Sequence, residues 1–194
     1  MPDQQLTTRG AATRQRIIDV ATREFAEHGI AGARIERVVA AARTNKAQLY
    51  AYFGNKEGLF DAIFFASLER IVDVVPIDAT DLPDWAVRLY DEYLQNPELI
   101  RLATWTRLER RPAGHLVTET DRLDTSKLQA ITQAQADGLV RDGDPFDLMA
   151  MVIAMSMAWS PVSNVYAATA GEPAEAHDRR RDFLRDSVRR AVAP

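Results

Sequence analysis

The chain has 194 residues, of which 46% are hydrophobic and 27% charged, values that are ordinary for a soluble protein of one or two globular domains. It contains no cysteine, which excludes a disulfide framework and a thiolate nucleophile and agrees with a reducing cytoplasm. Its polar start predicts no signal peptide, and its most apolar run, residues 148–159, is shorter than the about 20 residues that a membrane-spanning helix needs. We therefore expect a cytoplasmic protein that does not enter the membrane.

Charge is distributed unevenly along the chain. Residues 1–60 contain 9 Lys and Arg against 6 Asp and Glu, whereas residues 61–194 contain 15 against 22, so a net charge of +3 is followed by one of −7. A basic segment on an acidic body would attract DNA to one end of the protein only. Because the positive balance is modest, chance is the alternative explanation.

The first part of the chain predicts three helices. Apolar residues repeat at helical spacing over residues 13–25, and Gly29 provides a C-terminal stop. Two short helices are indicated at residues 34–42 and 46–52. Asn45 is well placed to cap the second of these, because its side chain can accept hydrogen bonds from N–H groups of the first turn.

Helical patterns also fill the rest of the chain. A fourth helix opens at Lys56 and is expected to end before Pro76, which it cannot easily pass, and residues 76–83 form a linker. Five further helices are predicted at residues 84–95, 97–110, 118–138, 145–169 and 174–192. No alternating apolar pattern indicates a strand, so the expected fold is all-α with about nine helices.

Residues 14–60 have the layout of a helix-turn-helix with a supporting first helix, in which the second helix of the motif enters the DNA major groove. The stretch resembles the DNA-binding domain of the TetR/AcrR family of bacterial transcriptional regulators. The matching elements agree in order and separation, and they are Arg16-Ile17-Ile18, Phe25-Ala26-Glu27-His28-Gly29, Ala41-Ala42, Leu49-Tyr50-Ala51-Tyr52-Phe53 and Lys56-Glu57-Gly58-Leu59. The resemblance implies a DNA-binding domain over residues 1–60 and a helical ligand-binding and dimerisation domain over residues 61–194.

The predicted recognition helix needs one anchored face and one face that carries hydrogen-bonding groups. Leu49 and Phe53, four residues apart, are expected to be the anchors. Gln48 can pair bidentately with adenine, and Ala47 can approach a thymine methyl group. Hydroxyl and cationic side chains nearby suit phosphate oxygens. The complete set of DNA-binding candidates is Arg34, Thr44, Asn45, Lys46, Ala47, Gln48, Tyr50, Tyr52 and Lys56.

Two positions depart from the family's pattern. The family commonly has Gly in the turn and a Thr cap before its second helix, whereas this chain has Arg43 and Ala33. A bulky residue at positive φ is uncommon, and loss of a hydroxyl cap costs about 0.5–2 kcal/mol. Arg43 therefore either bends the turn differently or is tolerated at positive φ, and we expect the fold to be retained in both cases.

The last predicted helix carries an apolar stripe with arginines on its other sides. Two C-terminal helices from each subunit would form a four-helix interface, and paired DNA half-sites require a dimer. We therefore predict a homodimer whose interface includes Phe183, Leu184 and Val188. The alternative is that this stripe packs within one subunit.

A pocket for a small apolar or amphipathic effector would be lined by apolar and aromatic side chains with few polar groups. Methionine suits such a wall because it adapts to irregular shapes. The candidates are Trp105, Leu108, Met151, Met155, Trp159 and Tyr166. The alternative for each of them is an ordinary place in the core.

Enzyme chemistry has little support in this chain. The histidines are scattered without metal-ligand spacing, and Gly54 and its neighbours lack the pattern of a phosphate-binding loop. We predict no catalytic residue, metal site or cofactor. The sequence therefore predicts a ligand-responsive repressor that binds a palindromic double-stranded DNA operator as a dimer. The alternative is a small-molecule binding protein without specific DNA binding.

Overall fold

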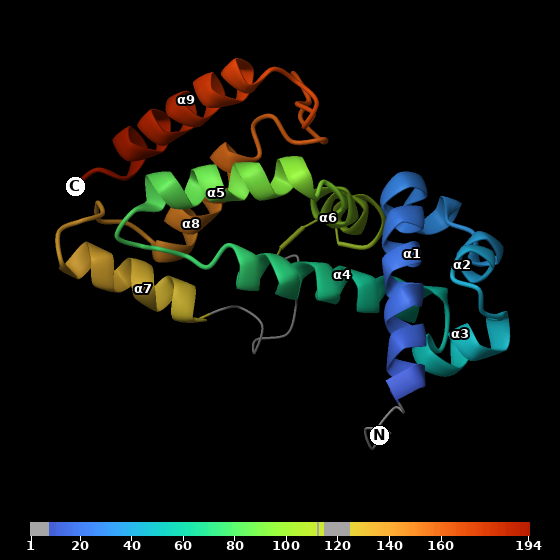
Figure 1. The fold of residues 1–194 in the computed structure, drawn as a ribbon. Coiled ribbons are helices and arrows are strands. Elements are labelled where there is room, and N and C mark those ends of the chain that lie inside the picture. Colours follow the sequence, from blue (N-terminus) through green and yellow to red (C-terminus); the bar gives the residue numbers. More distant parts are fainter. Residues whose placement is uncertain (1–7, 112, 115–124) are drawn as a thin grey trace. The chain divides into compact units, whose positions relative to one another are not determined.

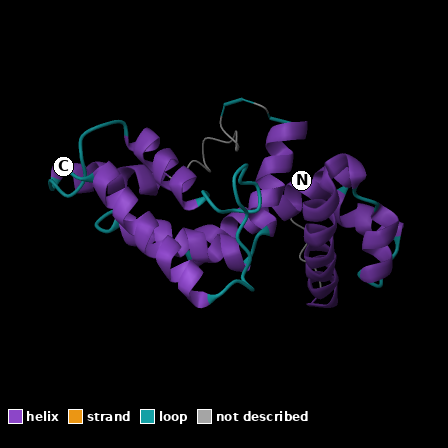
Figure 2. Cartoon of the chain, turned by 90° about the horizontal axis from the view of Figure 1, so that it is seen from above, coloured by secondary structure: helices purple, strands orange, loops and turns teal. Residues whose placement is uncertain are grey.

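The computed structural model describes residues 8–111, 113–114 and 125–194 (Figure 1). Within these ranges every regular element is a helix (Figure 2), which confirms the predicted all-α class. The helices are α1 (Thr8–Gly32), α2 (Ile35–Ala41), α3 (Lys46–Phe53), α4 (Lys56–Val74), α5 (Leu82–Gln95), α6 (Glu98–Glu109), α7 (Thr125–Ala136), α8 (Pro145–Ser156) and α9 (Ala174–Val192).

The chain divides into two compact units. The first unit comprises Met1–Glu69 and Arg101–Pro112, and the second comprises Arg70–Ile100 and Ala113–Pro194. The boundaries fall inside α4 and α6, so each of these helices contributes residues to both units. The predicted DNA-binding domain, residues 1–60, belongs to the first unit, which also takes most of α6 from the predicted C-terminal domain.

In the first unit, α1 packs against α2 and α3, which also pack against each other. Their contacts bury Ile17 and Phe25 of α1, Val38 of α2 and Leu49 of α3 completely. α1 starts at Thr8, five residues before the predicted start at residue 13. Gly29, with a φ of 71°, ends the regular part of α1 as predicted, but one more turn follows as far as Gly32.

In the second unit, α5 is the central helix and packs against both α8 and α9, while α7 packs against α8 (Figure 1). α5 begins with Asp81, whose side chain accepts a hydrogen bond from the Asp84 N–H group at 3.0 Å. Its apolar residues recur at three- and four-residue intervals, which puts Trp85, Leu89 and Tyr93 in the core. This helix therefore carries much of the second unit's interior.

Two of the predicted helices differ in extent from the helices observed. α8 ends at Ser156, whereas the sequence pattern predicted a helix as far as residue 169. Pro161 has no N–H group and disfavours helical backbone at the residue before it, and the chain turns there until the Ala168 N–H group reaches the Trp159 carbonyl at 3.0 Å. For the helix predicted at 118–138, residues 118–124 lie outside the described residues. No described helix is long and apolar enough to span a bilayer.

Candidate nucleic-acid interface and ligand pockets

The third helix, α3, has one buried face and one polar face. Asn45 caps it as predicted, since its Oδ1 atom accepts a hydrogen bond from the Gln48 backbone N–H group at 2.9 Å. Leu49 and Phe53 are 0% and 8% exposed, which confirms that they anchor the helix. The residues that the same helix leaves exposed are Lys46, Ala47, Gln48, Tyr50 and Ala51. Tyr52 is half-buried.

The side-chain amide of Gln48 is oriented by its neighbour Thr44. The Thr44 hydroxyl group lies 2.6 Å from Gln48 Oε1 and donates to it. An amide oxygen has a second lone pair, and the Nε2 group keeps both of its protons, so Gln48 can still accept from and donate to a base edge. Thr44 and Asn45, both DNA-binding candidates, therefore have a role in positioning Gln48 and its helix.

The predicted cations are already engaged within the first unit. Lys46 Nζ lies 2.5 Å from Glu36 Oε1, and this hydrogen bond raises the pKa of Lys46. Both side chains are exposed, so the pair is weak and a phosphate can compete for the lysine. Lys56 Nζ donates to the Ala31 carbonyl at 3.2 Å, which ties α4 to the end of α1. Arg34 is exposed at the start of α2.

Arg43 makes the turn in the helix-turn-helix in a conformation that usually belongs to glycine. Its φ is 51°, the one positive value among the described non-glycine residues. The turn is held by hydrogen bonds from the Arg43 N–H group to the Ala40 carbonyl at 3.2 Å and from the Thr44 N–H group to the Val39 carbonyl at 3.0 Å. Of the two alternatives for this position, the structure therefore shows the second: the arginine is tolerated in left-handed backbone.

The start of α2 is bound by a side chain from another helix. The N-cap residue is Arg34 rather than Ala33, and its own side chain makes no cap hydrogen bond. Instead, Glu24 of α1 accepts from the Arg34 N–H group at 2.8 Å and pairs with Arg37 at 2.5 Å. Burial would raise the pKa of the Glu24 carboxyl group, but the hydrogen bonds from Arg37 and Arg34 outweigh it and lower that pKa. Glu24 therefore ties the start of α2 to α1, and nothing local in the sequence indicates it.

The connection from α3 to α4 depends on Gly58. Asn55 Oδ1 accepts a hydrogen bond from the Gly58 N–H group at 2.7 Å, which caps the first turn of α4. A Cβ atom added at Gly58 would lie 2.2 Å from the Phe53 carbonyl oxygen, a distance at which atoms overlap. The Lys56-Glu57-Gly58-Leu59 element therefore has glycine because the end of α3 passes directly against it.

The end of α1 is held by three side chains from α6. The Arg101 Nε and Trp105 Nε1 groups both donate to the Ala26 carbonyl, at 2.7 and 3.3 Å. The Glu109 carboxylate accepts from the N–H groups of Ile30 at 3.1 Å and Ala31 at 3.0 Å. We call Arg101, Trp105 and Glu109 the α6 clamp. Its members are four residues apart and so lie along one side of α6.

The clamp revises two ligand-binding predictions. Trp105 packs against Gly29, where a Cβ atom would lie 2.9 Å from the indole ring, and its N–H group is occupied by Ala26. Trp105 therefore has a structural position against α1. Leu108, on the same helix, is 69% exposed. Neither residue lines any of the pockets described below.

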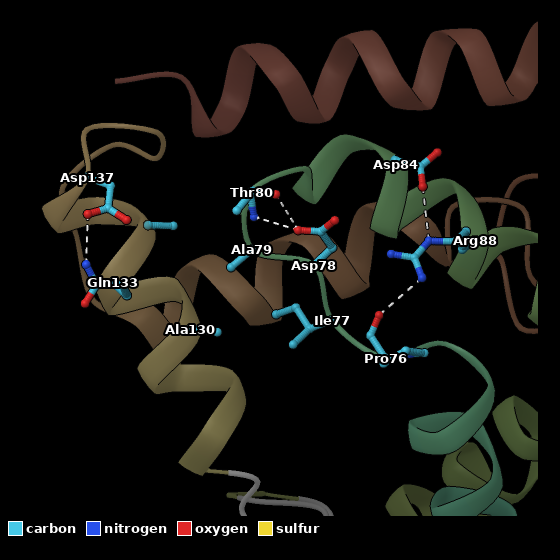
Figure 3. A pocket seen from close by; sticks show the side chains of 11 residues that line it. Pro76, Ile77, Asp78, Ala79, Thr80, Asp84, Arg88, Ala130, Gln133 and Asp137 are labelled. Atoms are coloured by element: carbon cyan, nitrogen blue, oxygen red, sulfur yellow. Dashed lines mark hydrogen bonds and ion pairs between the residues drawn. The ribbon is translucent and has the colours of Figure 1, made fainter.

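A first pocket of about 660 Å³ lies in the second unit, among the segment that follows α4, the start of α5, and α7 (Figure 3). Its wall combines apolar residues such as Ile77 and Ala130 with charged and polar ones. Asp78 accepts a hydrogen bond from the Thr80 N–H group at 2.9 Å, and Arg88 donates to both Asp84 and the Pro76 carbonyl, at 3.1 and 3.3 Å (Figure 3). None of the predicted ligand-binding residues lines it.

A second pocket of about 540 Å³ lies between α9 and the loop that precedes it. We call it the aromatic pocket, and its wall consists of Trp159, Tyr166, Glu172, Ala176, Arg179, Arg180 and Phe183. Two predicted ligand-binding residues, Trp159 and Tyr166, are brought together here. Met151 and Met155 of α8 do not line it: Met151 is 37% exposed, and Met155 is half-buried.

Two of the three residues predicted for the subunit interface face inward. Leu184 and Val188 are 2% and 0% exposed within the single chain, where α9 packs against α5. They therefore have no surface left for a partner, and the prediction for these two residues is wrong. An amphipathic pattern requires burial of the stripe but does not distinguish burial within a chain from burial between chains. Phe183 is 65% exposed and lines the aromatic pocket.

Two segments that together make up most of the chain match one family of proteins. Residues 17–63 match the family described as bacterial regulatory proteins, tetR family, and residues 81–190 match the tetracyclin repressor-like C-terminal domain. The chain belongs to the TetR family. The resemblance seen in residues 14–60 is confirmed and extends to the helical body. Among the described residues, no cluster of His, Asp and Glu could hold a metal ion.

Individual members of the TetR family resemble the chain over nearly its full length. It is 37% identical over 184 residues to the HTH-type transcriptional repressor SCO4008 of Streptomyces coelicolor, covering 93% of each chain. A crystal structure of the putative transcriptional regulator SCO4942 from Streptomyces coelicolor has a TM-score of 0.78 and 35% identity, covering 93% of this chain and 98% of that one. The structure of AibR with isovaleryl coenzyme A and operator DNA shares the fold, at a TM-score of 0.65 and 18% identity, covering 91% and 97%.

Proposed function

We propose that this TetR-family regulator is a cytoplasmic, dimeric repressor that binds a palindromic DNA operator and releases it when a small molecule binds. The observation that carries the proposal is α3, a short helix anchored by Leu49 and Phe53 with Lys46, Gln48 and Tyr50 exposed. This is the arrangement of a helix that enters the major groove. The relative SCO4008 is named a transcriptional repressor, which supports the direction of control.

In this proposal Gln48 reads a base, and its neighbours set the register on the duplex. The Gln48 amide, oriented by Thr44, has the donor and acceptor pair that recognises adenine. Lys46, Tyr50 and Tyr52 contact phosphates, which position the helix without selecting a sequence. Phosphate contacts also make the affinity fall as salt concentration rises.

Two DNA-binding domains are required because one α3 helix contacts only one half-site. We place the subunit interface on the face of α8 where Ala150, Met151 and Ala154 are exposed, since this face is apolar and its small side chains allow close approach. The inward-facing residues Leu184 and Val188 of α9 support this surface from within the subunit.

The α6 clamp is the proposed link between the ligand and DNA. α6 has its first residues in the second unit and Arg101, Trp105 and Glu109 in the first, where they hold the end of α1. A ligand that favours one position of α6 would thereby change the position of α1, and through it the spacing of the two recognition helices. The affinity for DNA falls to the extent that the ligand prefers the conformer with unsuitable spacing.

The proposal is tested by selecting bound fragments from random double-stranded DNA and measuring their affinity in gel shifts at several salt concentrations. We expect an enriched palindrome whose half-sites are about 34 Å apart, or a multiple of this distance. A scrambled fragment of the same composition serves as the control and should bind much more weakly. If no sequence is enriched and all fragments bind equally, the protein is a small-molecule binding protein without specific DNA binding.

A further inference from the structure

Three polar atoms in the described part of the second unit are buried without a hydrogen-bond partner: Ser160 Oγ, His177 Nε2 and Arg180 Nη1. The residues that carry them are 5%, 5% and 7% exposed. A buried polar group without a hydrogen-bond partner destabilises the folded protein, and a charged one does so more strongly. Of the three residues, Arg180 is the charged one and also lines the aromatic pocket, so an occupant of that pocket can supply it with an acceptor.

Trp159 and its neighbour Tyr90 connect the residues that carry these three atoms. Ser160 follows it in the chain, and the Tyr90 ring meets the Trp159 indole edge-on at 5.9 Å between centroids. The Tyr90 hydroxyl group in turn lies 2.7 Å from His177 Nδ1, so His177 is held with only its Nε2 atom unpaired. Arg180 lines the aromatic pocket together with Trp159.

Arg180 is only partly neutralised. Its Nη2 group lies 2.6 Å from Glu172 Oε2, and this hydrogen bond lowers the pKa of Glu172, so the carboxylate is charged at neutral pH. The guanidinium group lies over the Tyr166 ring, 5.2 Å from its centroid, and its Nη1 group has no acceptor. With Arg179 also in the wall, the aromatic pocket has two positive charges and one negative charge.

The rest of the wall suits an apolar or aromatic group. Phe183 is 65% and Tyr166 51% exposed, so two large rings stand open to solvent beside Trp159. A volume of about 540 Å³ is in the range of small-molecule sites. A net charge of one suits a monoanion, whereas a dianion such as a phosphate group would be repelled by Glu172.

We infer that the aromatic pocket binds a small aromatic carboxylate, whose oxygen atoms accept from Arg180 Nη1 while its ring packs against Trp159 and Phe183. The exposed Tyr166 ring moves off the guanidinium group to admit the carboxylate. Only one part of this inference rests on the proposed function: that the ligand is the effector that releases DNA. The binding site itself is independent of DNA.

Calorimetry on the full-length protein without DNA tests the site. The probes are benzoate, phenylacetate and 3-phenylpropionate, each paired with its uncharged amide. We expect at least one carboxylate to bind and its amide to bind at least tenfold more weakly. Arg180→Gln and Phe183→Ala should each weaken carboxylate binding about tenfold. Arg189→Gln, an exposed arginine on the same helix away from the pocket, should have no effect.

Phe183→Ala is expected to fold even if Arg180→Gln does not, because Phe183 is exposed whereas Arg180 is buried. If Arg180→Gln does not fold, two other measurements test the inference. They are the ratio of carboxylate to amide affinity in the unsubstituted protein and the carboxylate affinity of Phe183→Ala. The inference is overturned if no carboxylate binds, if the amides bind equally well, or if Phe183→Ala leaves the affinity unchanged. A carboxylate that binds but fails to release the selected operator overturns its role as effector. Absence of operator binding overturns the proposed function and leaves the calorimetric result standing.

Discussion

At the level of single residues, the helix-turn-helix shows how one strained position can be tolerated. Arg43 has a φ of 51°, where a side chain with a Cβ atom costs about 1–2 kcal/mol relative to right-handed backbone. The packing of Val38 and Leu49 on either side of the turn, both 0% exposed, holds the backbone in place. The strain is therefore carried by the surrounding core.

Replacing Arg43 with glycine should stabilise the protein. Glycine relieves the left-handed strain but loses more entropy on folding, so we expect a net gain of about 0.5–1 kcal/mol in the free energy of unfolding. Urea denaturation measures it. Arg43→Ala is the control, because alanine keeps the Cβ atom and should give no gain. Equal stabilisation by both variants would mean that the arginine side chain, rather than the backbone, is the source of strain.

Gln48→Ala tests whether this side chain recognises a base, as proposed. We expect specific binding to weaken by about 1–3 kcal/mol and the preference at one base pair of each half-site to relax. Thr44→Val, which removes the hydroxyl group that orients the amide, should have a smaller effect in the same direction. Gln129→Ala, an exposed glutamine on α7, is the matched control. Unchanged base preference in Gln48→Ala would place this residue away from the groove.

At the level of helices, α6 illustrates a role that its amphipathic pattern does not reveal. The pattern predicted a helix at residues 97–110, and the structure has one from Glu98 to Glu109. The hydrogen-bond partners of Arg101, Trp105 and Glu109 lie 75 to 79 residues earlier in the chain. Local spacing alone cannot indicate such contacts, and for this reason Trp105 was assigned to a ligand pocket.

Glu109→Ala should loosen the α6 clamp. The substitution leaves the N–H groups of Ile30 and Ala31 without their acceptor, so we expect a loss of about 1–2 kcal/mol in stability. It should also reduce the factor by which an effector lowers DNA affinity, measured by gel shift with and without the effector. Leu108→Ala, at a neighbouring residue that is 69% exposed, is the control and should change neither quantity. A Glu109→Ala protein with full stability and full response would exclude the clamp as the link.

For the whole molecule, we propose that the buried face of α9 stabilises the fold and that the exposed face of α8 forms the subunit interface. Leu184→Ala removes a buried side chain that packs against α5 and should cost about 2–5 kcal/mol in the free energy of unfolding. Ala154→Arg places a charge on the exposed face of α8 and should instead give a folded monomer that no longer binds the operator. Sedimentation velocity and thermal melting distinguish the two results. A dimeric Ala154→Arg protein would move the interface to another surface.

Local patterns in the amino-acid sequence were sufficient for the helical class, for the DNA-binding head and for the anchors of α3. Apolar spacing defined Leu49 and Phe53 as buried, and the capping preference of Asn45 defined where α3 starts, because both depend on neighbours within four residues. The order and separation of the matching elements in residues 14–60 were enough to indicate the family. These features are short-range and can therefore be read along the chain.

Contacts between distant residues decided the rest. Glu24 ties the start of α2 to α1, Trp105 holds the end of α1, and Leu184 faces α5 instead of a partner. The aromatic pocket combines Trp159 and Tyr166, which were expected as ligand contacts, with Arg180, which was not. In each case periodicity shows that a side chain must be buried or paired, but the partner depends on how the helices pack, and only the tertiary structure determines that.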